Sequence, residues 1–110
     1  MKKENIMKVR QLENKNQFVM GNDKITIFQS YDSIIAIVDK DNKTLTLGCD
    51  WDYSRTTLKH LYIFIEEEVL FYMTTELKEE IRQALNSANK RQAIQKLIDN
   101  KKINYESEVK

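Results

Sequence analysis

The residues in this chain whose types suit chemistry are few, and most lie between Cys49 and His60. Asp50 and Asp52 flank the only tryptophan, Trp51, and two carboxylates so spaced are candidates for a hydrolytic dyad or a divalent-metal site. Residues i and i+2 share a face only in an extended chain, and no third ligand follows at a suitable spacing. Because aspartate is also common in turns and at helix caps, a structural role explains the pair more simply.

Cys49 and Ser54 are residue types that can act as nucleophiles, and the single histidine, His60, is the type that could serve as their base. A catalytic base needs a nucleophile and an orienting group, and nothing in the sequence brings these together. One cysteine forms neither an internal disulfide nor a zinc site, and Gly21 and Gly48 are too far apart for a phosphate-binding loop. We therefore expect a non-enzymatic protein without metal or cofactor, with Cys49 as a small buried residue and His60 beside an apolar helix stripe.

Composition narrows the class of protein further. A chain of 110 residues is expected to form a single domain, residues 1–110. Eighteen basic and seventeen acidic residues leave a net charge of +1, which excludes a nucleic-acid mimic by bulk charge and a basic protein that coats DNA. No apolar segment is long enough to span a bilayer, so we expect a cytoplasmic protein with no membrane partner.

The elements that must position these residues follow from hydrophobic periodicity. Period-two alternation and short polar turns predict an antiparallel β-meander of about four strands over residues 17–48. Residues 1–16 form either a polar arm or a short first strand. After Gly48 the period changes to 3.6, which predicts a helix over residues 54–68 with Ser54 as its N-cap and Asp52 as the competing cap.

The C-terminal part is expected to be helical over residues 75–100. A second helix runs from a cap at Thr75 through Ala88, and a third begins at the capping box of Asn89. Residues 69–73 stay open between a strand, a connector and a helical continuation, and residues 101–110 are expected to be a polar tail. Strands followed by two to three helices predict an α+β fold in which the helices pack on one face of the sheet.

Two charged clusters and one aromatic group are candidate binding surfaces. The clusters interact with a partner or are simply solvated. The aromatic group is Trp51 and Tyr53 with Arg55 and Lys59, which form either a stacking platform or a packed corner. The acidic cluster, suited to a basic groove, is Glu66, Glu67 and Glu68. The basic cluster, suited to nucleic-acid phosphates, is Lys90, Arg91, Lys96, Lys101 and Lys102.

Two segments of the chain resemble a known group of sequences. They are Gln29-Ser30-Tyr31-Asp32-Ser33-Ile34-Ile35-Ala36 and Trp51-Asp52-Tyr53-Ser54-Arg55-Thr56-Thr57-Leu58-Lys59-His60-Leu61. Over about residues 17–68 the chain resembles small proteins from phages, plasmids and other mobile elements of Gram-positive bacteria, which share a Q-S-Y-x-[ST]-x-I-A strand entry and a W-D-Y-S-x-T-T turn. The resemblance implies a scaffold or binding role for Tyr31, Trp51, Asp52, Tyr53, Ser54 and Arg55.

Some proteins similar to these are anti-CRISPR proteins, which inhibit type II RNA-guided nucleases. The resemblance implies an inhibitor that binds such a nuclease, with its guide RNA, in the bacterial host cell and blocks DNA binding or cleavage. The alternative is a small nucleic-acid-binding accessory protein of a mobile element, and a third possibility is a scaffold for an unrelated phage or host protein. A monomer and a homodimer are both compatible with the sequence.

Overall fold

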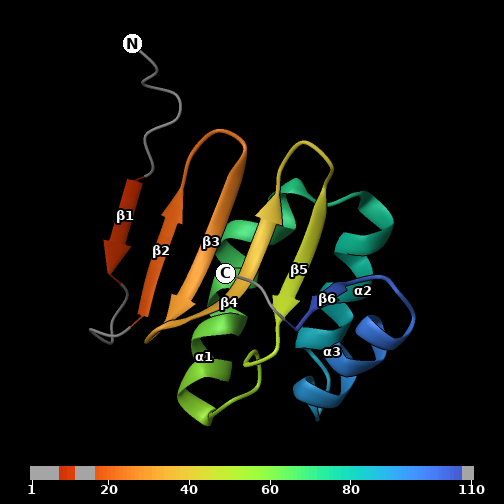
Figure 1. Cartoon of the computed structure of the whole chain (residues 1–110). Coiled ribbons are helices and arrows are strands. Elements are labelled where there is room, and N and C mark those ends of the chain that lie inside the picture. Colours follow the sequence, from red (N-terminus) through yellow and green to blue (C-terminus); the bar gives the residue numbers. More distant parts are fainter. Residues whose placement is uncertain (1–7, 12–16, 108–110) are drawn as a thin grey trace.

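In the described part of the chain, residues 8–11 and 17–107, the computed structural model has one six-stranded sheet in chain order (Figure 1). The strands are β1 (Lys8–Gln11), β2 (Gln17–Gly21), β3 (Ile25–Ser30), β4 (Ser33–Asp39), β5 (Thr44–Gly48) and β6 (Asn104–Glu106). Strands β1 to β5 pair antiparallel with their neighbours, and β6 pairs with β5 in parallel. The predicted antiparallel meander is confirmed. Of the two alternatives for residues 1–16, a polar arm or a short first strand, β1 is the strand. Residues 1–7 and 12–16 lie outside the described part.

One face of the sheet supplies its half of the core because side chains alternate along each strand. Register partners across β2 to β5 form a fully packed row on this face: Val19, Phe28, Ala36 and Leu47. The next row, on the opposite face, is partly exposed: Met20, Ile27, Ile37 and Thr46. Figure 1 shows the helices behind the sheet, on the side of the buried row, as the α+β prediction requires.

The helical path that begins with α1 (Arg55–Phe64) extends beyond the end of the predicted helix of residues 54–68. It continues through a π-helical turn, η2 (Ile65–Val69), and a 3-10 turn, η3 (Leu70–Tyr72). Negative charge is unfavourable near a helix C-terminus, and the predicted helix ended at the three glutamates. Ile65 and Val69 are fully buried, and their burial holds the chain helical across that cluster. The open question about residues 69–73 is thereby answered, because the helical path ends at Tyr72.

Helices α2 (Thr75–Leu85) and α3 (Lys90–Asp99) form an antiparallel pair beside β5 and β6 (Figure 1). Asn89 is confirmed as the N-cap of α3, since its side chain accepts a hydrogen bond from the backbone N–H of Gln92 at 3.1 Å. For α2 the cap was placed one residue too late: Thr74, which has extended backbone, accepts from the N–H of Leu77. Helix α2 also ends at Leu85 rather than Ala88, because the chain must reverse before α3 starts.

Residues 101–110 were expected to be a polar tail; residues 101–107 are exposed except for Ile103, but they also form a short strand that was not predicted. Lys101 adopts φ 64°, and the backbone N–H groups of Lys102 and Ile103 donate to the carbonyl of Leu97 at 2.8 and 3.2 Å. This C-terminal cap turns the chain back, buries Ile103 and places Asn104–Glu106 along the free edge of β5. A three-residue strand carries too little periodicity to be recognised in a sequence.

Candidate binding surface at the corner between sheet and helix

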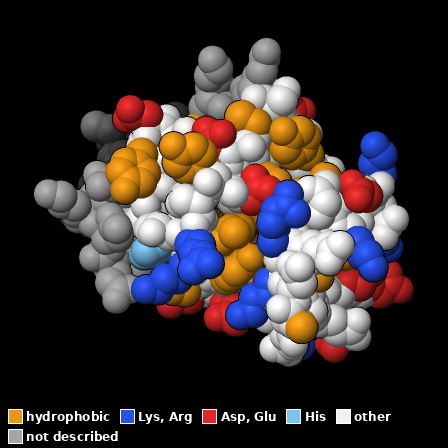
Figure 2. Space-filling view, turned by 90° about the horizontal axis from the view of Figure 1, so that it is seen from below, with side chains coloured by type: hydrophobic (Ala, Val, Ile, Leu, Met, Phe, Trp, Pro, Cys, Tyr) orange, Lys and Arg blue, Asp and Glu red, His pale blue; other side chains and the backbone are white. Residues whose placement is uncertain are grey.

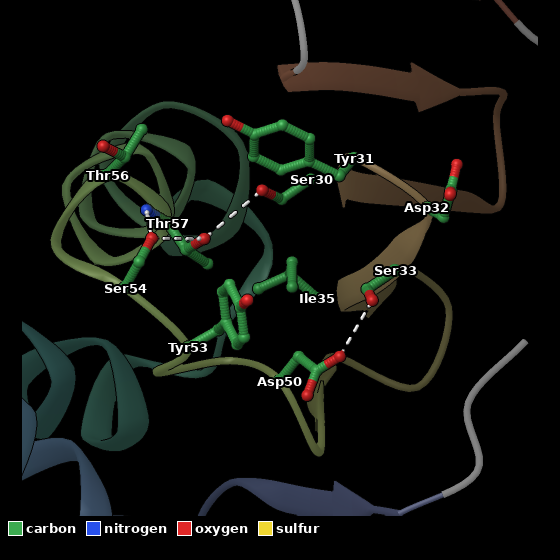
Figure 3. A pocket seen from close by; sticks show the side chains of 10 residues that line it. All are labelled: Ser30, Tyr31, Asp32, Ser33, Ile35, Asp50, Tyr53, Ser54, Thr56 and Thr57. Carbon is green, nitrogen blue, oxygen red and sulfur yellow. Dashed lines mark hydrogen bonds between the residues drawn. The ribbon is translucent and has the colours of Figure 1, made fainter.

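The two segments that carry the sequence resemblance meet at one end of the sheet (Figure 3). One is the tight turn between β3 and β4, where Tyr31 has φ 54° and its carbonyl accepts a hydrogen bond from Nε2 of Gln29 at 2.8 Å. The other is the connection from β5 to α1, folded as two successive turns in which Trp51 N–H donates to the Gly48 carbonyl and Tyr53 N–H to the Asp50 carbonyl. Between them lies a cavity of about 610 Å³, which we call the corner cavity.

Buried hydroxyl groups join the first turn of α1 to the end of β3. Ser54 Oγ accepts from the backbone N–H of Thr57 at 3.1 Å, so Ser54 is the N-cap, as predicted, and Asp52 is not. The Ser54 hydroxyl donates to Oγ1 of Thr57 at 3.1 Å, and that oxygen lies 3.3 Å from Oγ of Ser30. Ser30 and Thr57 are both buried, so this chain of hydroxyls fixes the distance between helix and sheet at the cavity.

The two aspartates of the corner diverge and form no dyad. Asp50 accepts a hydrogen bond from the Ser33 hydroxyl at 2.8 Å. Asp52 accepts a hydrogen bond from Nε of Arg91 at 2.8 Å and forms an ion pair with its guanidinium, whose Nη2 lies 2.8 Å from the same Oδ2 atom; this contact ties α3 to the corner. No group of three or more His, Cys, Asp or Glu side chains in the described part of the chain is arranged to hold a metal ion.

The two aromatic residues of the corner have different environments. Trp51 is only 3% exposed, and the Arg91 guanidinium lies 5.7 Å from its ring centroid, so Trp51 packs the corner. Tyr53 is 74% exposed and Tyr31 is 52% exposed. This exposure is unexpected, because burying an aromatic ring would add much apolar surface to the core of so small a domain. Figure 2, which views this end of the molecule, shows hydrophobic side chains at the surface with basic ones beside them.

The candidate nucleophiles and the histidine are not assembled. Cys49 is exposed, which contradicts the expectation of a buried residue, because it lies in the outward part of the turn that buries Trp51. His60 is buried on the stripe of α1 itself, and its Nδ1 donates to the Thr56 carbonyl at 2.9 Å. Among residues 8–11 and 17–107, its buried Nε2 has no hydrogen-bond partner. No hydrogen bond within the described residues joins His60 to Cys49 or Ser54.

The predicted basic cluster does not lie on one face. Arg91 is engaged by Asp52, and Lys102 forms an ion pair with Glu80 at 3.4 Å. Five residues separate Arg91 from Lys96, a rotation of about 140° around the helix. Lys101 lies near the edge of β6, in a shallow hollow that it shares with Asp99 and Glu106.

A second hollow joins part of both predicted clusters along the outer face of α1. It has a volume of about 430 Å³ and brings together Arg55, Lys59, Lys90 and Glu66 around the apolar side chains Leu58, Tyr62 and Ile63; we call it the basic groove. Lys90 Nζ lies 5.5 Å from the Tyr62 ring centroid. Burial raises the pKa of Tyr62, and Asp52 raises it further while Arg91 lowers it.

Ser30, Ser33 and Thr57 are among the lining residues of the corner cavity that are absent from the candidates drawn from the sequence. Their partners are distant in the chain: Ser33 and Asp50 are 17 residues apart, and Ser30 and Thr57 are 27 apart. The only signal for them was their position inside the two segments of the resemblance. Serine and threonine in turns and caps are too common to indicate a site without that context.

Comparison with known proteins adds a family but no activity. No curated protein and no solved structure matches the chain. Within the described residues, no helix has the length and apolar character that crossing a membrane requires. A family model described as "Family of unknown function (DUF8033)" matches residues 1–84, a range that includes the whole corner cavity and excludes α3 and β6. Because this match spans 84 of 110 residues, the chain belongs to that family of unknown function.

Proposed function

We propose that the protein is a non-enzymatic inhibitor that acts by binding another protein. The observation that carries this proposal is the pair of exposed tyrosines, Tyr31 and Tyr53, on two sides of a cavity of about 610 Å³. Tyrosine is enriched in protein interfaces because it offers a large, rigid contact area and loses little conformational entropy. The hydroxyl chain through Thr57 and Ser30 holds the two supporting turns in place, so the surface is organised before a partner arrives.

The proposed target is a type II RNA-guided DNA nuclease. This choice rests on the resemblance of Gln29–Ala36 and Trp51–Leu61 to proteins that include anti-CRISPR inhibitors. A bound protein of this size inhibits such a nuclease by covering the DNA-entry surface or by preventing the nuclease-domain docking that licenses cleavage. The host cytoplasm, where the nuclease works, is the proposed location.

The test is capture and cleavage with a reconstituted type II effector, with and without guide RNA. Wild-type protein is expected to bind the effector and stop DNA cleavage, and the dependence on guide RNA then identifies the assembly step that is blocked. Tyr53→Ala is expected to weaken capture by about tenfold or more, as loss of a central interface tyrosine does. Phe71→Ala is the matched control, because Phe71 is a similarly exposed aromatic (79%) at the opposite end of the helical path that begins at Arg55.

Two results would count against the proposal. Full cleavage in the presence of excess protein, with effectors from several Gram-positive hosts, would remove the nuclease as target. Loss of inhibition with Phe71→Ala but not with Tyr53→Ala would move the binding surface away from the corner cavity.

The basic groove favours a second candidate function, nucleic-acid binding by an accessory protein of a mobile element. Arg55, Lys59 and Lys90 line one hollow with Tyr62, which is the combination of cations and an aromatic ring that binds single strands. Binding of a labelled single-stranded oligonucleotide should then weaken steeply with salt, and Arg55→Ala should lower the slope of log K against log salt by about one. An absence of binding at low salt would exclude this function.

A further inference from the structure

The corner cavity is lined by tyrosine rings, by hydroxyl groups and by a carboxylate. Figure 3 places the Tyr31 ring on one side and the Tyr53 ring on the other, beside Ile35. The hydroxyl chain of Ser30, Thr57 and Ser54 forms a second wall. Its volume of about 610 Å³ lies within the range of small-ligand sites, about 300–1,000 Å³, so it admits a large side chain together with the atoms that flank it.

Asp50 is the carboxylate of this cavity. Its Oδ2 accepts the Ser33 hydroxyl at 2.8 Å, and its Oδ1 has only a weak thiol contact, with Cys49 Sγ at 3.8 Å. No lysine or arginine of the described chain pairs with Asp50, and none lines the cavity. The other acidic lining residue, Asp32, points away from the cavity in Figure 3. A carboxylate oriented by a hydrogen bond and left without a cation is an acceptor for an incoming positive charge.

The tyrosine rings favour the same kind of ligand. Aromatic faces attract cations, and a guanidinium group stacks on them more readily than an ammonium because it is planar and weakly hydrated. Its N–H groups lie in its own plane, so they can reach a carboxylate or hydroxyl at the rim while both faces contact rings. An arginine side chain therefore matches the chemistry of the two tyrosines, the carboxylate and the hydroxyl oxygens.

The alternative ligand for this cavity is an anion, because the N-terminus of α1 lies at the cavity and favours negative charge. Two observations weigh against it. Ser54 already occupies, through its side chain, one of the otherwise free N–H groups of the first turn, that of Thr57. The cavity is also lined by no cationic side chain of residues 17–107 that could balance an anion, and Asp50 would repel one.

We infer that the corner cavity binds an arginine side chain presented by the partner protein, held between Tyr31 and Tyr53 and paired with Asp50. This inference rests on the proposed function for the existence of a protein partner. The chemistry of the cavity is nevertheless open to a test that needs no nuclease.

The test uses a capped pentapeptide with a central arginine and glycines on both sides, titrated into ¹⁵N-labelled full-length protein. The matched peptides carry lysine, or citrulline, which keeps the shape of arginine but has no charge. The arginine peptide is expected to shift the amide signals of Ser33, Asp50, Tyr53 and Thr57, and the citrulline peptide to bind about tenfold or more weakly. Asp50→Asn, which keeps an oxygen acceptor for Ser33, should reduce arginine-peptide binding by a similar factor, and Asp41→Asn in the β4–β5 turn should not.

Equal binding of the arginine and citrulline peptides, no shift at the corner, or shifts there with inorganic phosphate instead would each overturn the inference. The proposed function is judged separately by capture and cleavage. If wild-type protein and Asp50→Asn inhibit the nuclease equally well, the arginine site is wrong and the inhibitor function stands. If the arginine peptide binds at the corner but no effector is captured, the nuclease target is wrong and the arginine site stands.

Discussion

Replacing Arg91 by alanine tests how strongly α3 is held to the corner between sheet and helix. Arg91 donates from Nε to Oδ2 of Asp52 at 2.8 Å, its Nη2 lies 2.8 Å from the same oxygen in the ion pair, and its guanidinium lies 5.7 Å from the Trp51 ring centroid. The side chains of the ion pair are 49% and 24% exposed, so the pair belongs with partly solvated ones. We assign about 1 kcal/mol to the pair and about 0.5 kcal/mol to the contact with the ring.

Arg91→Ala is thus expected to lower the free energy of unfolding by about 1.5 kcal/mol and the melting temperature by about 6 °C. Asp52→Ala should cost about 1 kcal/mol, and the double variant little more than Arg91→Ala alone. Urea denaturation followed by tryptophan fluorescence measures all three, because Trp51 is the only tryptophan. The coupling energy, about 1 kcal/mol, should fall when salt is raised to about 1 M.

Arg82→Ala is the matched control. Arg82 also forms an ion pair, with Glu79 at 3.4 Å within α2, but both side chains are more than half exposed. Its loss should change the free energy of unfolding by less than about 0.5 kcal/mol. A coupling energy between Arg91 and Asp52 that is no larger than this, at low salt, would refute the role assigned to the pair.

Three further predictions concern the scaffold. Ser54→Ala removes the side-chain cap of α1 and should cost about 1 kcal/mol in a chemical denaturation experiment, and an unchanged midpoint would mean that the cap is replaced by water. Phe64→Ala removes a buried ring that stacks on Phe28 with centroids 5.5 Å apart; a loss of about 3–5 kcal/mol is expected from calorimetry, and a loss below about 1 kcal/mol would contradict this packing. Hydrogen bonds from Asn42, mainly from its backbone N–H and next from its side chain, lower the pKa of Asp39 below 3.8. The carboxylate therefore stabilises the folded state at pH values above the unfolded pKa, and this stabilisation is lost as the pH falls through the lower, folded pKa. An NMR titration that finds the Asp39 pKa at or above 3.8 would rule this out.

Much of the fold could be predicted from the sequence because its signals are local. The period-two strands between residues 17 and 48 and the change of period after Gly48 depend on neighbours within a few positions. The caps Ser54 and Asn89 are equally local, since each bonds to an N–H three residues later. Where local signals compete, the prediction was wrong by a residue or a turn, as at Thr74 and at Leu85.

The sequence by itself therefore determined the order of strands and helices, the α+β class and the main helix caps. Only the tertiary structure decided that Trp51 is buried while Tyr53 is exposed, that Asp52 binds Arg91 at a separation of 39 residues, and that the chain returns after α3 to add β6 to the sheet. The physical reason is that exposure and long-range pairing depend on how whole elements pack, whereas periodicity reports only which face of one element is apolar. The corner cavity belongs to this second kind of feature, because its two halves come from turns that meet only when α1 docks on the sheet.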